Sequence, residues 1–250
     1  MSGDRVDLCF GVGGAKAIVL APLTGADEAA AAAPDHLLRR LALTGERLVH
    51  GEELAQMTIG DRDRAIAALF RQLYGDVVQA DAVCAGCAAT YEIRFSLAAL
   101  TAGRVPDGTA SGDPAAITLG DTRLRLPQMR DFTGAPDDLI ARLVLTGPDP
   151  DPQAAEHALE GADPALELDL TGTCPECDTV QATPFSMAGF LQASMQRDRA
   201  FLAREVHLIA SAYHWSLAEI HSLTRHDRQT YARLLIAERE AGAVQIRRAS

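Results

Sequence analysis

The chain has 250 residues, of which 48% are hydrophobic and 23% charged, a composition that suits one large globular domain or two smaller ones. Its formal net charge of −11 argues against broad binding to phosphate backbones, because such binding needs a basic surface. No apolar run reaches the roughly 18 residues that a bilayer-spanning helix needs, and residues 1–14 do not have the pattern of a secretory signal, so we expect a cytoplasmic protein.

Residues 1–50 are the first of three predicted regions and contain short strands and a helix. Glycines interrupt the apolar stretch at residues 7–23, which favours a β-hairpin, because the segment lacks the Gly-Lys-Ser/Thr ending of a phosphate-binding loop. Cys9 lies in this apolar stretch, so we expect its side chain to be buried. Residues 35–43 predict a short helix.

The second region, residues 51–185, begins with a clear amphipathic helix over residues 58–76. Ile66 and Leu69 lie on one face of this helix at helical spacing, which predicts packing against the core. Asp61 and Asp63 are predicted to lie in its first turn, where the helix dipole favours negative charge.

Further strands and helices are predicted between the middle of the chain and residue 170. A Gly-Asp turn joins two strands within residues 117–132. Residues 136–145 and 154–163 predict short helices, the first because a proline and two aspartates stand at its start. Residues 165–170 alternate between apolar and acidic side chains, which predicts a strand.

Four of the five cysteines come as two pairs, Cys84 with Cys87 and Cys174 with Cys177, and two residues separate the members of each pair. In a reducing compartment such pairs are more often metal ligands than disulfides. Strand-like residues flank each pair, so each pair is predicted to lie at the tip of a β-hairpin.

The two cysteine segments also match beyond the cysteines. In both, a Phe-Ser dipeptide begins 11 residues after the first cysteine, at Phe95–Ser96 and at Phe185–Ser186. An apolar helix start follows each serine, and serine is a favoured N-cap residue. The segments near residues 76–95 and 165–185 therefore predict two copies of one unit, a hairpin followed by a capped helix.

Two such hairpins facing each other can place four thiolates tetrahedrally around one ion, which is the arrangement of a zinc ribbon, here split by a long insertion. Thiolates favour zinc or an iron–sulfur cluster, and paired cysteine turns favour zinc. Four protein ligands leave no open position for water or substrate, so we predict structural Zn²⁺ held by Cys84, Cys87, Cys174 and Cys177. Four buried cysteines without a metal are the alternative.

The third region, residues 186–250, is predicted to be helical. A long helix is expected over residues 186–213, a capping box of Ser216 and Glu219 begins a second helix, and Thr224 can cap a third. The predicted fold class is therefore α+β, with a split four-cysteine zinc ribbon of two β-hairpins, surrounding helices and a C-terminal three-helix segment.

Motifs of catalysis are absent from the sequence, which has no nucleophile elbow, no His-Glu-x-x-His helix and no complete phosphate loop. We therefore expect neither an enzyme nor a small-molecule substrate. Arg225, His226, Arg228 and Arg233 give residues 212–235 local positive charge, as in a helix-turn-helix DNA reader, but a turn glycine is missing. The alternative function is a zinc-ribbon nucleic-acid-binding or transcription-related adaptor. The overall acidity opposes that alternative.

The C-terminal stretch over residues 202–235 resembles a segment of phage baseplate hub-assembly proteins from T-even-like contractile tails and related injection systems. The middle of the chain is similar to bacterial members of this group, which have a TIGDRDR…LYGD helix before a first cysteine pair and an RLRLP strand before a second. The residues that carry the C-terminal resemblance are Glu205, Val206, His207, Tyr213, His214, Trp215, Ser216, Glu219, Ile220, Arg225, Arg228, Tyr231 and Leu234.

The resemblance implies a non-enzymatic assembly factor, chaperone or structural component of the baseplate of a contractile phage-like tail or injection system. Its partners would be other baseplate or tail proteins, with no membrane and no nucleic acid. Exposed aromatic and arginine side chains are common anchors of protein interfaces. The partner-binding residues that we predict are Tyr213, His214, Trp215, Arg225 and Arg228. Packing of the helices against each other is the alternative role of Tyr213 and Trp215.

Overall fold

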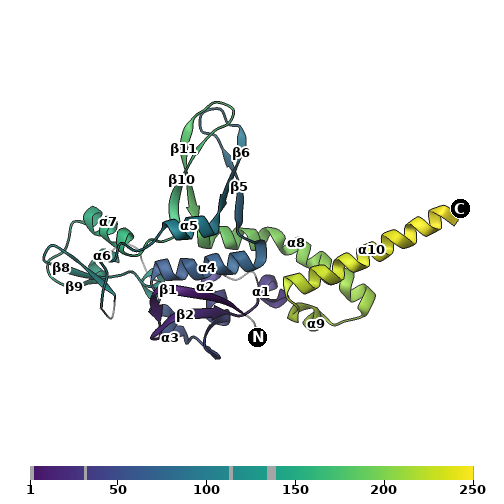
Figure 1. The fold of residues 1–250 in the computed structure, drawn as a ribbon, viewed down its shortest axis with the longest axis horizontal. Coiled ribbons are helices and arrows are strands. Elements are labelled where there is room, and N and C mark those ends of the chain that lie inside the picture. Colours follow the sequence, from purple (N-terminus) through teal and green to yellow (C-terminus); the bar gives the residue numbers. More distant parts are fainter. Residues whose placement is uncertain (1–2, 31–32, 113–114, 134–138, 250) are drawn as a thin grey trace.

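The computed structural model describes residues 3–30, 33–112, 115–133 and 139–249 (Figure 1). It is a mixed α/β fold in which these residues form small antiparallel sheets surrounded by helices. No helix in this described part of the chain is both long and apolar enough to cross a membrane.

The N-terminal lobe is an antiparallel sheet in the order β1-β2-β3-β4. Its first two strands form the hairpin that the sequence predicts. Strand alternation turns Val6 and Leu8 inward and leaves Cys9 exposed, so the prediction of a buried Cys9 is wrong. The elements of this lobe are β1 (Asp4–Val12), β2 (Ala15–Leu20), α1 (Gly25–Ala30), α2 (Pro34–Leu41), β3 (Ala42–Thr44), β4 (Arg47–Leu48) and α3 (Gly51–Ala55).

A second, smaller lobe has a sheet in the order β7-β8-β9. The helix predicted over residues 136–145 is wrong at its C-terminal end, where β-branched Val144 pairs with Leu124 in the sheet, and residues 136–138 lie outside the described residues. The elements of this lobe are β7 (Ala116–Leu119), β8 (Thr122–Arg125), the 3-10 helix η1 (Met129–Thr133), α6 (Leu139–Leu143), β9 (Val144–Thr146) and α7 (Pro152–Ala162).

The two lobes share a plan and a sequence. Residues 37–45 read LLRRLALTG and residues 139–147 read LIARLVLTG, with six identical residues out of nine. In both lobes a helix runs directly into a strand that pairs with the second strand of a hairpin, β3 on β2 and β9 on β8. Both segments end at a glycine with positive φ, 63° at Gly45 and 101° at Gly147, a backbone region that glycine adopts without strain. The internal duplication therefore extends beyond the cysteine segments.

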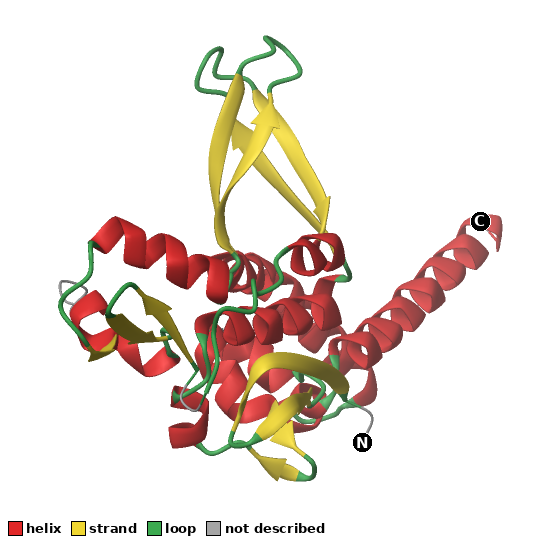
Figure 2. Cartoon of the chain, turned by 60° about the vertical axis from the view of Figure 1, so that its left-hand side comes forward, coloured by secondary structure: helices red, strands yellow, loops and turns green. Residues whose placement is uncertain are grey.

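Each lobe leads through a helix into a cysteine hairpin and then into another helix. In the first half these elements are α4 (Ile59–Tyr74), β5 (Val77–Val83), β6 (Thr90–Ser96) and α5 (Leu97–Gly103). In the second half they are α7, β10 (Glu167–Thr173), β11 (Val180–Ser186) and α8 (Met187–Tyr213). Figure 2 shows the two hairpins standing side by side above the helical body, with their turns at the tip.

The C-terminal region contains α8, α9 (Leu217–Ser222) and α10 (Arg225–Ala249), and the last of these extends away from the body (Figure 1). The predicted capping box is confirmed, because the Ser216 Oγ accepts from the Glu219 amide and the Glu219 carboxylate accepts from the Ser216 amide. The Thr224 Oγ1 accepts from the Asp227 amide at 3.2 Å, so Thr224 caps α10 as predicted.

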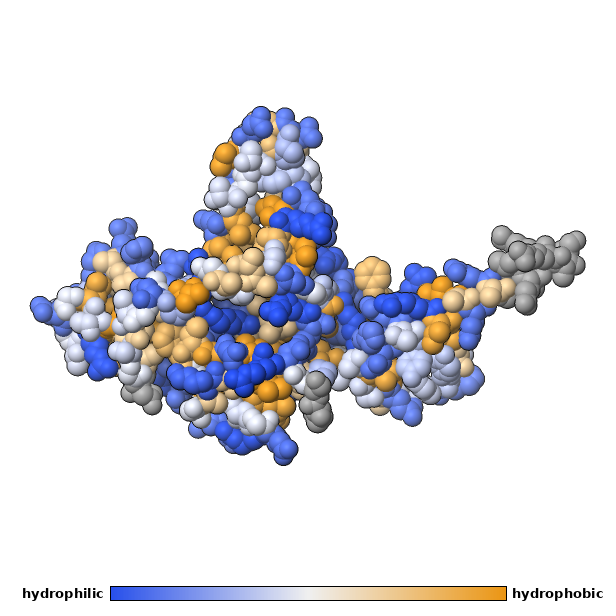
Figure 3. All heavy atoms as spheres, in the orientation of Figure 1, coloured by the Kyte–Doolittle hydropathy of each residue, from blue (hydrophilic) through white to orange (hydrophobic). Residues whose placement is uncertain are grey.

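Most buried apolar side chains form one core between the N-terminal sheet, α2, α4, the feet of the hairpins and the first half of α8. Phe95 and Phe185, equivalent residues of the two hairpins, meet edge to face at those feet, with ring centroids 5.3 Å apart. Figure 3 shows apolar surface at the feet and mostly hydrophilic surface at the tips. Apolar packing thus anchors the hairpins below, and another interaction must hold their tips.

Candidate metal centre

The two cysteine hairpins have the same register, shifted by 90 residues. Val77 pairs with Ser96 at the open end of the first hairpin, and Glu167 pairs with Ser186 in the second. The pairing continues without a bulge to Val83 and Thr90, and to Thr173 and Val180. The two hairpins are therefore equally long, and their cysteine turns lie at the same height above the helical body.

The turns that carry the cysteines also match in their backbone hydrogen bonds. The Cys84 amide donates to the Ala89 carbonyl and the Cys174 amide donates to the Thr179 carbonyl, both at 2.9 Å. Each turn passes through a left-handed residue one position after the second cysteine, Ala88 with φ 59° and Asp178 with φ 57°. Residues other than glycine rarely adopt this conformation, so its occurrence in both turns marks a shape that the site requires.

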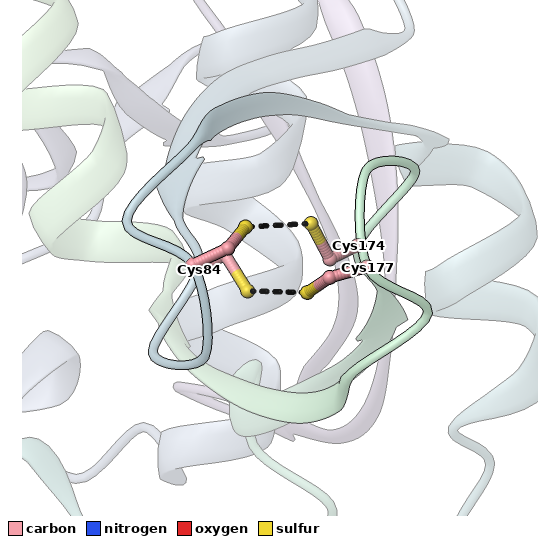
Figure 4. A group of neighbouring side chains, drawn as sticks. Cys84, Cys174 and Cys177 are labelled. Atoms are coloured by element: carbon pink, nitrogen blue, oxygen red, sulfur yellow. Dashed lines mark hydrogen bonds between the residues drawn. The ribbon is translucent and has the colours of Figure 1, made fainter.

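The four thiols lie within 4.8 Å of one another and form a group that could hold a metal ion. The Cys84 and Cys177 sulfur atoms are 3.6 Å apart, and those of Cys87 and Cys174 are 3.7 Å apart. Figure 4 shows the thiols of Cys84, Cys174 and Cys177 pointing toward one another from opposite turns. The predicted ligand residues are therefore brought together, two from each half of the chain.

The first cysteine of each pair is buried and the second is exposed. Cys84 and Cys174 pack with Ala82 and Tyr91 in a small apolar cluster between the hairpins. Burial of one ligand from each hairpin limits the access of water to the inner side of the site, and the exposed ligands leave an entry path for an ion.

Gln181 joins the two hairpins beside the cysteines. Its side-chain nitrogen donates to the Val83 carbonyl at 3.0 Å, and its side-chain oxygen accepts from the Ala85 amide at 2.8 Å. Both partners lie in the other hairpin, on either side of Cys84. This contact fixes the facing arrangement of the turns through backbone groups, which have no freedom of side-chain rotation.

Thr179 favours the ionised form of one thiol. Hydrogen bonds from its hydroxyl and its backbone amide, together with the neighbouring thiols, lower the pKa of Cys177 to about 6. The Ala89 amide favours the Cys87 thiolate in the same way, but proton sharing with Cys177 raises the pKa of Cys87 to about 12. One thiol of the group is thus ready to bind a cation near neutral pH, and binding would displace the protons of the others.

The predicted partner-binding aromatics form a separate cluster about the turn between α8 and α9. Tyr213 stacks on Trp215 with ring centroids 5.3 Å apart, and Tyr231 of α10 meets both rings edge on. Tyr213 is 37% exposed, and His214 is exposed in a left-handed conformation that ends α8. The aromatic cluster therefore joins the end of α8 to α10 and also presents a face to solvent.

The predicted partner-binding arginines lie elsewhere. Arg228 is fully buried and donates to Glu28 at 2.6 Å and to Glu205 at 3.2 Å. Arg225 donates to Glu28 and Asp198. In place of the partner-facing position that we expected, the structure gives both side chains an internal role, because desolvated guanidinium groups require such carboxylate partners. They join the C-terminal helices to the N-terminal lobe, and carboxylates balance both of their charges.

Two buried aspartates of α4 have structural roles that the sequence did not reveal. Asp61 accepts the amides of Cys9, Phe10 and Gly11 at 2.7–2.9 Å, where the register of β1 on β2 breaks. Asp63 accepts the Leu166 amide at 2.7 Å, directly before β10. Two aspartates in the first turns of a core helix were the available signal, but their distant partners leave no mark in the sequence.

Comparison of the chain with protein-family models, with curated proteins and with solved structures returns no match. The class that the fold and the site define is a mixed α/β chain with a cluster of four cysteines that could hold a metal ion. A function for the protein must therefore be argued from the cysteine cluster and from the surfaces around it.

Proposed function

We propose that the cysteine cluster is a structural zinc site, a zinc ribbon split between the two halves of the chain. We further propose that the chain is a non-enzymatic assembly factor, chaperone or structural component of the baseplate of a contractile phage-like tail or injection system. The observation that carries the proposal is the convergence of four thiols from two equivalent turns. A ligand set supplied wholly by the protein suits a metal that stiffens a scaffold.

The spacing of the thiols supports zinc. Tetrahedral zinc with Zn–S bonds of about 2.3 Å places its sulfur ligands about 3.8 Å apart. Separations of 3.6 and 3.7 Å between thiols of opposite hairpins agree with that value. When bound, the ion would join the hairpin tips, and Cys84, Cys87, Cys174 and Cys177 would hold it.

The surface near the aromatic cluster supports a binding role. Tyr213, Trp215 and exposed His214 lie at the turn between α8 and α9, within the stretch that resembles baseplate hub-assembly proteins. Leu217 at the start of α9 and Leu234 on α10 add apolar surface, with exposed fractions of 57% and 52%. Aromatic side chains with an exposed face are frequent anchors of protein interfaces.

The zinc site is tested by the metal content of purified protein, measured by elemental analysis. We expect one zinc ion per chain, lost in Cys174→Ser and retained in Cys9→Ser, because Cys9 lies outside the cluster. A folded wild-type protein that contains no metal would contradict the zinc site. Iron with a visible absorption band would instead identify an iron–sulfur cluster.

The assembly role is tested by co-expression of the tagged chain with the baseplate and tail proteins of a contractile system from the same host. We expect a complex with one of these proteins that Trp215→Ala weakens. Phe201→Ala is the control, since Phe201 is a 62% exposed aromatic on α8 that lies outside the cluster. Failure to recover any contractile-tail component would overturn the proposal.

Binding to DNA separates this role from a zinc-ribbon adaptor of nucleic acids. With a net charge of −11 and with Arg225 and Arg228 in ion pairs, the protein should not shift a DNA duplex at low salt. Salt-sensitive binding of DNA would favour the adaptor.

A further inference from the structure

The duplication makes the two halves of the chain comparable residue by residue. α4 precedes the first hairpin and packs on β1, and α7 precedes the second hairpin and packs on β7. The 90-residue shift of the hairpins also holds in these helices. Ala65 and Leu69 of α4 are buried, as are the equivalent Ala155 and Leu159 of α7. α2 and α6 correspond through the LLRRLALTG and LIARLVLTG segments, at a longer shift of 102 residues (139 − 37).

The helices that follow the hairpins differ between the halves. α8 has 27 residues and packs on α2 and α4 of the first half, where Phe190 of α8 contacts Phe70 of α4 with ring centroids 5.5 Å apart. α5 has 7 residues and ends at Gly103. Arg104, directly after α5, donates to Glu160 of α7 at 2.9 Å, so α5 leads toward the second half but stops there.

The position in the second half that corresponds to the α8 site is hollow. A cavity of about 660 Å³ lies there, and α6 and α7 contribute most of its wall. Leu139 and Ile140 of α6 line it and are only half-buried, whereas the equivalent Leu37 and Leu38 of α2 are fully buried in the core that α8 completes. Among the described residues, no helix covers this face of α6.

The wall on the α7 side of the cavity is acidic. Glu156, Glu160 and Asp163 all line the cavity. Their equivalents in the first half are Ile66, Phe70 and Leu73, which belong to the apolar core or pack against it. The cavity therefore forms a slot between α6 and α7. Its α6 wall is apolar, as in the first half, whereas its α7 wall has carboxylates where α4 has apolar side chains.

Asp163 is the most deeply placed of these carboxyl groups. It is 6% exposed, and its Oδ2 accepts from the Gly60 amide at 2.8 Å. Its Oδ1 is buried and has no hydrogen-bond partner among the described residues. This oxygen lies against the first turn of α4, close to Gly60 and to the Arg64 guanidinium, so contacts within the chain set its position.

We propose that the slot between α6 and α7 is a docking site for an amphipathic helix of a partner protein. The helix would be apolar where it meets α6 and would have Arg or Lys along the edge that meets α7. The occupant is a helix because α8 fills the equivalent position of the first half, and it is basic because the α7 wall is acidic. The Arg104–Glu160 contact is an existing example of that charge pairing.

The slot is tested with a synthetic helical peptide of about 15 residues, with leucines at helical spacing and arginines along one edge. A matched peptide keeps the leucines and replaces the arginines by glutamates. Binding to the zinc-loaded full chain is measured by fluorescence anisotropy. We expect saturable binding of the basic peptide and none of the acidic one.

Two variants locate the binding. Glu156→Lys changes an exposed side chain of the acidic wall, and it should weaken the basic peptide about tenfold. Glu238→Lys makes the same charge change on α10, at the other end of the molecule, and should leave binding unchanged (Figure 1). Ile140→Gln removes part of the apolar wall and should weaken binding without altering its salt dependence.

Three outcomes overturn the assignment. The first is the absence of saturable binding of the basic peptide at concentrations up to about 1 mM. The second is equal loss of binding in Glu156→Lys and Glu238→Lys. The third is a dimer in analytical ultracentrifugation that Glu156→Lys dissociates, because the slot would then belong to a second copy of the chain. The slot and the aromatic cluster share no residues. A failure of the peptide experiment would therefore not bear on the baseplate role, which is tested through Trp215.

Discussion

The cysteine hairpins and the helices that follow them differ in how closely the two halves of the chain agree. The hairpins match pair for pair at a shift of 90 residues, and both turns use a left-handed residue at the equivalent position. The helices after them have 7 and 27 residues. In the proposed metal site four thiols must meet within bonding reach of one ion, so neither turn could change shape alone. No such requirement acts on the helices, and they have diverged.

Two single variants test the equivalence of the hairpins most strongly. Each removes one buried thiol, one from the first half of the chain and one from the second. Cys84→Ser and Cys174→Ser should both lose the metal and destabilise the protein by more than about 5 kcal/mol, because a structural ion contributes its binding energy to folding. Metal content and urea unfolding measure the effect. Metal retention in either variant, or a loss in the control Cys9→Ser, would contradict a shared four-thiolate site.

The next prediction concerns the C-terminal extension, the second half of α8 with α9 and α10, which has no counterpart after α5. Arg228→Met keeps most of the side-chain volume but removes one of the two arginine partners of buried Glu28 and the arginine that pairs with half-buried Glu205, so it should cost about 3–5 kcal/mol. Fluorescence of Trp215, which is the single tryptophan, follows urea unfolding of this region. The exposed Arg233, changed to Met, should cost less than about 0.5 kcal/mol. Similar losses in the two variants would argue that the buried pairs do not anchor the extension.

Asp163 should make stability depend on pH in the second half of the chain only, because its equivalent in the first half is the apolar Leu73. Burial raises the pKa of Asp163 to about 6 from an ordinary 3.8, although the Gly60 amide favours the charged form. The folded state therefore binds this proton more tightly than the unfolded state, and the resulting stability is lost as the pH rises through about 6.

Asp163→Asn removes the titrating carboxyl group, so the variant does not lose this stability as the pH rises. Relative to wild type, the variant should gain about 1.5 kcal/mol between about pH 5 and about pH 7.5, measured by urea unfolding at both values. Other titrations cancel in the comparison of the two proteins. A difference that does not change with pH would exclude a raised pKa at this carboxyl group.

The smallest effect concerns the serines that begin the two unequal helices. Ser96 caps α5 and Ser186 caps α8, with Oγ accepting an amide at 3.1 and 3.2 Å. Ser96→Ala and Ser186→Ala should each cost about 1 kcal/mol, seen as similar shifts of the thermal midpoint. A loss from one variant alone would mean that the caps no longer act as equivalent residues.

Features that depend on local sequence could be predicted. The hairpin tips, the capping box at Ser216 and the long helix ending at Tyr213 follow from alternation, turn residues and cap residues, and the structure confirms them. The matched cysteine and Phe-Ser steps predicted that the four thiols would meet. These signals lie within about a dozen residues of one another, the range over which sequence patterns are informative.

Features that depend on contacts between residues far apart in the sequence could not be predicted. The charge of Arg228 suggested a surface position. Its burial depends on hydrogen bonds to the carboxylates of Glu28 and Glu205, which the sequence near Arg228 does not reveal. The same holds for Asp61 and the amides of β1. The repeat of the lobes is hard to predict because its six matching residues, three leucines with an arginine, a threonine and a glycine, form no chemical motif.

The 90-residue shift also sets an order of events while the chain is being made. At synthesis rates of about 5–20 residues per second, the second cysteine turn leaves the ribosome roughly 5–20 s after the first. During that interval the first hairpin has two thiols and no means of completing a four-ligand site. Final closure of the tips therefore waits for Cys174 and Cys177, and a nascent chain stalled before them would expose the apolar foot around Phe95.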